Sequence, residues 1–349
     1  MVCGLCGAKR RCEGRIVCDM KRVVSLLPSA TEILCRIGGK ENFVGRSHEC
    51  DWPTDLSAIP VLTGQRTVYN PAGGIDSAAV DARVRASLDE AGSLYTLDAD
   101  LLADLAPDVI LTQDLCDVCC IDMSSVRDAI AKIGKKTGHE PRLIALSPET
   151  FEGVLDDHLT VGTAAGLEAE AAQAVFDLRS RWISAESYVN PYTEGPVVGF
   201  LEWTDPLYVA GHWSAQMIER AGGRHPLNEC VPLPNSGAAA GMQAGQRVAG
   251  KSIRVPAEAF VATRPEALVI CPCGLSLEQA WDETERLRDT AEWWGGLPAV
   301  RTGRVAVVDG SAMFNRPGPR LADAFEWLVG WLNGRDSLIP DDFPWREFK

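Results

Sequence analysis

Short apolar runs alternate along this chain with longer segments whose apolar residues recur at helical spacing. Such runs, bounded by turn residues, are typical of buried parallel strands. The strands are expected at residues 22–27, 43–45, 109–112, 143–146, 197–201, 267–270 and 305–308. Helices are expected from residue 28, at 101–105, and at about 214–221, 277–290 and 320–332. Strands that alternate with helices predict parallel α/β sheets.

A long helical region divides this pattern into two halves. Ser147 as N-cap and Pro148 in the first turn are expected to start it, and Gly166 is expected to interrupt it. The fold prediction is therefore two three-layer α/β lobes joined by a long interlobe helix. The predicted parts are a disordered cysteine-rich tail, an N-terminal lobe, the interlobe region and a C-terminal lobe, at residues 1–21, 22–147, 148–189 and 190–349.

The net charge of −14 argues against nucleic acid and anionic membrane surfaces as partners. Apolar stretches are strand-sized, so a soluble protein is expected. Residues 1–20 lack the apolar core of a secretory signal, which predicts a cytoplasmic protein. The basic residues near the start leave organellar targeting open; they are Lys9, Arg10, Arg11 and Arg15.

Twelve cysteines without a recognisable signal suggest free thiols in a reducing compartment. Cys116, Cys119 and Cys120 follow the strand at 109–112, and the carboxyl ends of parallel strands form the edge where open α/β sheets bind ligands. Cys116 and Cys119 are spaced to hold one ion or form a redox disulfide, and simple buried packing is the competing interpretation. Gln113 and Asp114 are candidate polar contacts to a ligand.

His48, Glu49 and Cys50 follow the strand at 43–45 and bring imidazole, carboxylate and thiol together. These groups suit zinc, cobalt or iron. His48, Cys50, Cys116 and Cys119 are therefore the candidate metal ligands. The alternative is an ordinary loop with solvated acids.

The second lobe has its own candidates after the strand at 197–201. Trp203 and Trp213 are candidates to stack on a planar ring, and His212 is a candidate axial nitrogen. Glu202 lies beside them. Arg316 is a candidate clamp for a ligand carboxylate or phosphate. Structural roles in core packing or a surface turn are the competing interpretations.

Several sequence words resemble one known family. They are RVVSLLPSATEIL, VGRSHECDWP, LTQDLCDVCC, EWTDPLYVAGHW, ICPCG and RPGPRL. Together they resemble the iron-siderophore/cobalamin periplasmic-binding domain family over residues 22–333, in its cobalamin-binding branch without a signal peptide. The resemblance implies a rigid interlobe helix and a ligand held between the lobes. The ligand-binding set is then expected to include Ser29, Arg46, Ser47, Glu49 and Trp52. Secreted members dock on a membrane permease, a partner that is doubtful for a chain without an export signal.

Two functions follow as hypotheses. The first is a carrier, store or sensor for cobalamin or a related corrinoid or metal chelate. The second is a zinc or iron metalloprotein or metalloenzyme that uses His48, Cys50, Cys116, Cys119 and His212 in the same cleft. Thiol redox chemistry at Cys116 and Cys119 is a third possibility. Neither a nucleophile–base arrangement nor a phosphate-binding glycine loop is legible, so catalysis is not the leading expectation.

Overall fold

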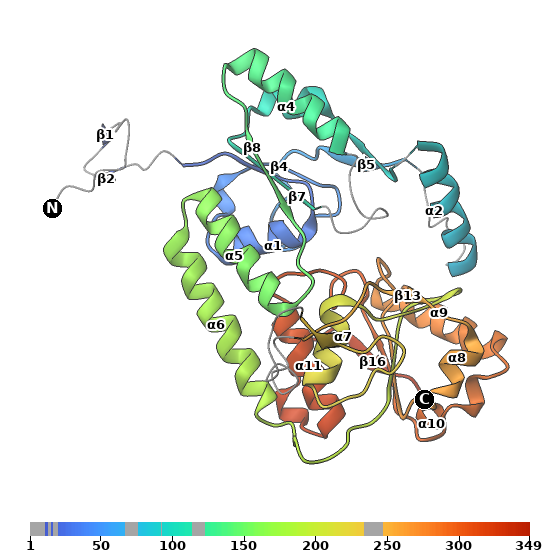
Figure 1. The fold of residues 1–349 in the computed structure, drawn as a ribbon. Coiled ribbons are helices and arrows are strands. Elements are labelled where there is room, and N and C mark those ends of the chain that lie inside the picture. The colour runs from blue at the N-terminus through green and yellow to red at the C-terminus, as the bar shows by residue number, and fades with distance from the viewer. Residues whose placement is uncertain are drawn as a thin grey trace.

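The computed structural model describes residues 20–66, 76–91, 93–113, 123–233 and 247–349, together with the backbone of the short strands β1 (Arg11–Cys12) and β2 (Arg15–Ile16). Figure 1 shows two α/β lobes connected by a pair of helices, α5 and α6. The predicted fold class is confirmed. The boundaries predicted for the parts of the chain stay predictions, and most of residues 1–19 lie outside the description.

A parallel sheet of strand order β4-β3-β7-β8 forms the centre of the N-terminal lobe. Its strands are β3 (Val23–Ser25), β4 (Phe43–Arg46), β7 (Val109–Gln113) and β8 (Arg142–Leu146). The helices of this lobe are α1 (Pro28–Arg36), α2 (Ser77–Ala91), α3 (Ala99–Leu105) and α4 (Met123–Thr137). Each strand expected from an apolar run is present, because burial on both faces requires such a run.

The antiparallel pair β5 (Thr63–Gln65) and β6 (Tyr95–Leu97) was not expected. Helix α2 lies between these two strands in the sequence. The segment from β5 to β6 begins next to the edge strand β4, because a backbone bridge joins Arg46 of β4 to Val61, two residues before β5. The β5–β6 pair therefore extends the N-terminal lobe beyond the edge strand β4.

The interlobe region consists of α5 (Phe151–Ala165) and α6 (Glu168–Glu186), which run side by side (Figure 1). The break predicted near Gly166 is confirmed, because Gly166 adopts φ of 74° and ends α5. The start predicted at Ser147 is wrong by a few residues. Thr150 is the N-cap, and its side chain accepts a hydrogen bond from the Gly153 amide.

The C-terminal lobe has a mixed sheet of order β13-β10-β9-β14-β15-β16, in which β9, β14 and β15 are parallel. The strands are β9 (Val198–Thr204), β10 (Leu207–Val209), β13 (Ile253–Arg254), β14 (Ala267–Ile270), β15 (Val305–Val308) and β16 (Trp345–Glu347). The antiparallel strands β10, β13 and β16 were missed by the sequence analysis. β13 and β16 form the exposed edges of the sheet, and β10 has only three residues, so none of them carries the longer apolar run of a central strand.

The helices of this lobe are α7 (His212–Arg220), α8 (Ala257–Ala262), α9 (Leu277–Thr290), α10 (Pro298–Arg301) and α11 (Leu321–Asn333). A small hairpin is formed by β11 (Val231–Pro232) and β12 (Arg247–Val248). Nowhere in the described chain does a helix combine the length and apolarity needed to span a membrane.

Candidate functional site

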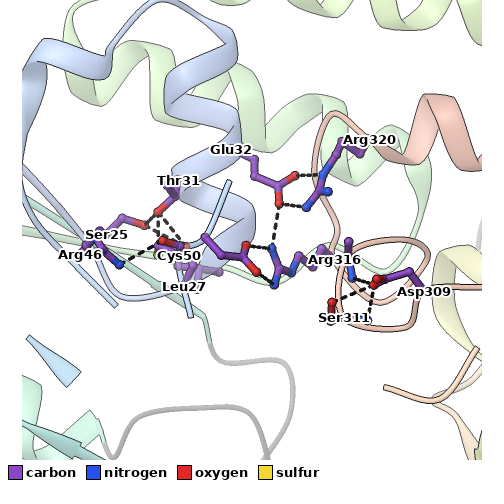
Figure 2. A network of polar contacts seen from close by, with 12 residues as sticks. Ser25, Leu27, Thr31, Glu32, Arg46, Cys50, Asp309, Ser311, Arg316 and Arg320 are labelled. Atoms are coloured by element: carbon purple, nitrogen blue, oxygen red, sulfur yellow. Dashed lines mark hydrogen bonds and ion pairs between the residues drawn. The ribbon is translucent and has the colours of Figure 1, made fainter. Parts of the chain in front are cut away.

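Contacts between the lobes show that the carboxyl ends of their strands face one another. Glu32 of α1 is completely buried, and Arg316 and Arg320 of the segment after β15 both bind its carboxylate. Arg316 Nη1 lies 3.2 Å from Glu32 Oε1, and Arg320 Nε donates to Glu32 Oε2 at 2.9 Å (Figure 2). The turn after β3 therefore lies against the loop after β15.

Arg316 also forms a two-pronged ion pair with Asp51, with N–O distances of 2.6 and 3.1 Å. Burial opposes ionisation of Asp51, but the adjacent Arg316 holds the pKa of Asp51 below its usual value. The guanidinium predicted to clamp a ligand anion is thus occupied by protein carboxylates from the opposite lobe. We refer to Glu32, Asp51, Arg316 and Arg320 as the interlobe ion cluster.

His48 lies three residues before Asp51, in the loop that follows β4. Its Nδ1 is 2.6 Å from Thr63 Oγ1, and its backbone N–H donates to the same oxygen at 3.0 Å. Its Nε2 is buried and has no hydrogen-bond partner among the described residues. Burial lowers the pKa of His48, although Glu49 opposes this, so the imidazole is neutral at pH 7. When Nδ1–H donates to Thr63, Nε2 presents a free lone pair.

The surroundings of His48 come from two strands that the sequence analysis missed. Ser47 Oγ lies 3.0 Å from Thr63 Oγ1 in β5. The Tyr95 hydroxyl of β6 donates to Glu49 Oε1 at 2.9 Å, and the Tyr95 ring centroid is 5.5 Å from that of His48. We call these five residues the His48 cluster. In metal sites, the ring nitrogen of a histidine that does not bind the metal usually forms a hydrogen bond that orients the ring. The contact between Nδ1 and the Thr63 hydroxyl orients the His48 ring in the same manner.

Cys50 does not join this cluster. Its thiol is buried and accepts a hydrogen bond of 2.9 Å from the Thr31 hydroxyl (Figure 2). Burial raises its pKa to about 11, whereas a metal ligand must be the thiolate. The described residues also contain no group of three or more histidine, cysteine or acidic side chains placed to hold an ion. Without a metal, Cys50 is therefore a buried, hydrogen-bonded thiol, and its role as a metal ligand beside Cys116 and Cys119, which lie outside the described residues, stays a prediction.

The state of Cys50 can be checked by alkylation. At pH 8, a thiol with a pKa near 11 is ionised in about one molecule in a thousand, so Cys50 should react with iodoacetamide far more slowly than exposed Cys273. Peptide mapping of the native protein by mass spectrometry measures both rates. Equal modification of the two cysteines would contradict the assignment.

The remaining N-terminal candidates have mixed positions. Arg46 donates to the backbone carbonyls of Ser47, Cys50 and Leu56, so it shapes the loop. Ser29 is buried in α1. Gln113 is half-buried at the end of β7, while Asp114, Cys116 and Cys119 lie outside the described residues. Trp52 is 37% exposed, with the Arg320 guanidinium 5.1 Å above its ring.

In the C-terminal lobe, the position of Trp213 contradicts its predicted stacking on a ligand. Trp213 is buried in the core, where its indole N–H donates to the Phe314 carbonyl at 2.5 Å. Trp203 is half-buried, and its indole N–H lies 3.0 Å from the Asp205 carbonyl oxygen. Helical spacing after Gly211 places Trp213 on the inner face of α7, a placement that the local sequence alone did not reveal.

His212 keeps a free ring nitrogen. Its Nδ1 is buried and unpartnered within the described part of the chain, and burial lowers its pKa. The residue is held at φ of 47°, a conformation that is costly outside glycine and is often found at functional sites. Glu202 accepts a long hydrogen bond of 3.4 Å from the Gly211 amide, directly before His212.

Two cavities of about 750 and 650 Å³ lie in the C-terminal lobe. The larger is bordered by the β9–β10 turn and α9, and the smaller by α7 and β12. Neither is lined by a residue that the sequence analysis selected. Among the selected residues that the structure describes, Arg316, Trp52 and Trp203 contact the opposite lobe.

Residues 23–312 match the family model described as periplasmic binding protein. The match spans most of the chain, so this chain belongs to the periplasmic binding protein family. No curated protein shows significant sequence similarity to it.

Solved structures with the same fold include proteins that are described as binding different ligands. A periplasmic heme binding protein from Pseudomonas aeruginosa is 19% identical, with a TM-score of 0.62 over 90% of this chain and 93% of that chain. The periplasmic vitamin B12 binding protein of Vibrio cholerae is 16% identical, with a TM-score of 0.57 over 91% of this chain and 98% of that chain. A possible iron-binding protein from Staphylococcus epidermidis is 18% identical, with a TM-score of 0.59 over 92% of this chain and 99% of that chain. At these identities the likeness shows the fold alone.

Proposed function

We propose that this protein binds a corrinoid, such as cobalamin, or another planar metal chelate between its two lobes. Family membership supports a ligand-binding role, and proteins of the same fold are described as binding vitamin B12 and heme. The observation that carries the proposal is the buried, unpartnered Nε2 of His48.

An unsatisfied buried polar atom costs about 1–3 kcal/mol, so such an atom is expected to meet a partner when the protein works. A neutral imidazole nitrogen suits cobalt, iron and zinc. The hydrogen bond to Thr63 orients the His48 ring, and the pairing of Tyr95 with Glu49 supports the loop. We assign His48 as the nitrogen that the N-terminal lobe offers to the metal of the chelate.

Other residues contribute contacts rather than coordination. Trp52 offers an exposed aromatic surface beside Arg320 at the lobe contact and replaces Trp213 as the candidate for ring stacking. The second unpartnered histidine, His212, belongs to the opposite lobe and is assigned to the same ligand. Arg316 keeps the lobes together and does not hold a ligand anion in this account.

Titration of the purified protein separates the two functional hypotheses. Cobalamin, hemin, a ferric siderophore and zinc are added in turn, and binding is followed by visible absorption and tryptophan fluorescence. The proposal expects saturable binding of a chelate at one molecule per chain. Zinc that stays bound at one equivalent through gel filtration, without chelate binding, would instead favour the metalloprotein hypothesis.

We also propose a reducing, cytoplasmic location. Its support is that Cys35, Cys50, Cys230, Cys271 and Cys273 are all unpaired thiols in the described structure. Thiol titration of protein isolated without reductant tests this, because a disulfide involving any of these residues would contradict it.

A further inference from the structure

Helix α2 belongs to the N-terminal lobe by sequence, but its first turn docks on the C-terminal lobe. Figure 1 shows α2 reaching from β5 toward α9. Ser77, the first residue of α2, is completely buried against residues of β9 and α9. Among positions 77–89 of α2, whose side chains are described, Ser77 is the only buried residue.

The docking contact is polar. The hydroxyls of Ser77 and Thr204 both donate to Glu283 Oε1 at 2.5 Å. Arg286 Nη2 donates to Ser77 Oγ at 2.9 Å, and Arg286 Nη1 lies 3.0 Å from Asp76 Oδ1. The Glu283 carboxylate is almost fully buried, and the first turn of α2 faces it with the positive end of the helix dipole. These contacts join the two lobes at the end of β9.

Helix α2 is attached in a way that would let it separate from the C-terminal lobe while the rest of the protein stays folded. Segments with few buried apolar contacts open at much lower free energy than the core of the same protein. Helix α2 has no buried apolar residue among the positions just given, so its position depends on the polar contacts of Asp76 and Ser77 with Glu283 and Arg286. Breaking that contact leaves the cores of both lobes intact.

The strands that flank α2 in the sequence carry two members of the His48 cluster. Thr63 begins β5 and orients the His48 ring, while Tyr95 begins β6 and binds Glu49. Because α2 lies between β5 and β6 in the sequence, we expect a displacement of α2 to affect both partners of the proposed binding loop. The interlobe ion cluster lies next to β15, whereas α2 docks next to β9, on the opposite side of β14.

We propose that α2 is a strap that closes the proposed interlobe site, and that release of Ser77 from Glu283 controls ligand entry and exit. The inference rests on the proposed function for its ligand, while the docking itself is independent of any ligand. In the docked state the strap and the interlobe ion cluster connect the lobes at two separate places. Release of the strap opens one of them.

Two variants test the strap, Ser77→Ala and Glu283→Gln, with Ser180→Ala in an exposed part of α6 as the matched control. Without ligand, hydrogen exchange should become faster in α2, β5 and β6 of both variants and stay unchanged in the control. The thermal midpoint of Ser77→Ala should change little, since the Glu283–Arg286 ion pair remains. The emission of Trp203 should also shift, because its indole N–H lies 3.3 Å from the Ser77 carbonyl oxygen.

The release rate of a bound corrinoid, followed by stopped-flow absorption, is expected to rise by at least about tenfold in both variants, since each weakens one or more hydrogen bonds of the closed state. Unchanged exchange in α2 would overturn the strap, and so would faster exchange with an unchanged release rate. Failure of the wild-type protein to bind any chelate would contradict the proposed function instead. The exchange measurement would then decide the strap by itself.

Discussion

Replacement of Glu32 by alanine is expected to lower the free energy of unfolding by about 3 kcal/mol, since removing one partner of a buried ion pair leaves the other charges without compensation. Glu32 is completely buried, and the side chains of Arg316 and Arg320 are only 12% exposed. Asp51 remains as a partner for Arg316, so Arg320 is the cation left unpaired. Urea unfolding followed by circular dichroism measures the change.

The control for this variant is Glu278→Ala. Glu278 pairs with Arg346 at 2.8 Å, but its side chain is 69% exposed. Exposed ion pairs contribute about 0–1 kcal/mol, so this change should be nearly neutral. Equal effects of the two substitutions would show that the interlobe ion cluster does not connect the lobes as described.

The second large effect concerns ligand binding. His48→Ala is expected to weaken binding of the chelate by about 100-fold, because even residues that only orient a metal ligand contribute about 10–100-fold. Thr63→Val should weaken it by about tenfold, since it removes the orienting hydroxyl and leaves the imidazole. Equilibrium titration by absorption gives both affinities, and unchanged affinity in His48→Ala would refute the assignment.

The pH dependence of binding provides a further check on His48. Metal coordination needs the neutral imidazole, and burial lowers the pKa of His48 below the usual value of about 6.5. Affinity should therefore be constant from pH 8 to about 6.5 and fall only at lower pH, as the folded-state imidazole becomes protonated. A decrease that begins above pH 7 would mean that His48 is not the titrating ligand.

The central parallel strands could be predicted because burial on both faces imposes an apolar run, as at Val109–Gln113. Gly166 marked the helix break because its left-handed conformation favours glycine. The edge strands β13 and β16 were missed because their exposed positions relax that requirement, and β10 was missed because it has only three residues. The sequence therefore predicted the buried central elements of the fold better than its exposed edges.

The candidate site was less predictable. Proximity to a strand end directed attention to His48, but its neighbours Thr63 and Tyr95 are distant in the sequence and belong to an antiparallel pair that no pattern revealed. Trp213 was misjudged because an indole looks the same in a sequence whether it faces a ligand or the core. The positions of Arg316 and Glu32 depend on the contact between lobes, which only the tertiary structure reveals.

The most direct measurement of the central claim is the visible absorption spectrum of a bound corrinoid that has no lower nitrogen base of its own. Coordination by His48 Nε2 predicts that the wild-type protein shifts this spectrum in the way free imidazole does. The shift should be absent in His48→Ala and restored when imidazole is added. Identical shifted spectra for the wild-type protein and His48→Ala, without imidazole, would contradict the account.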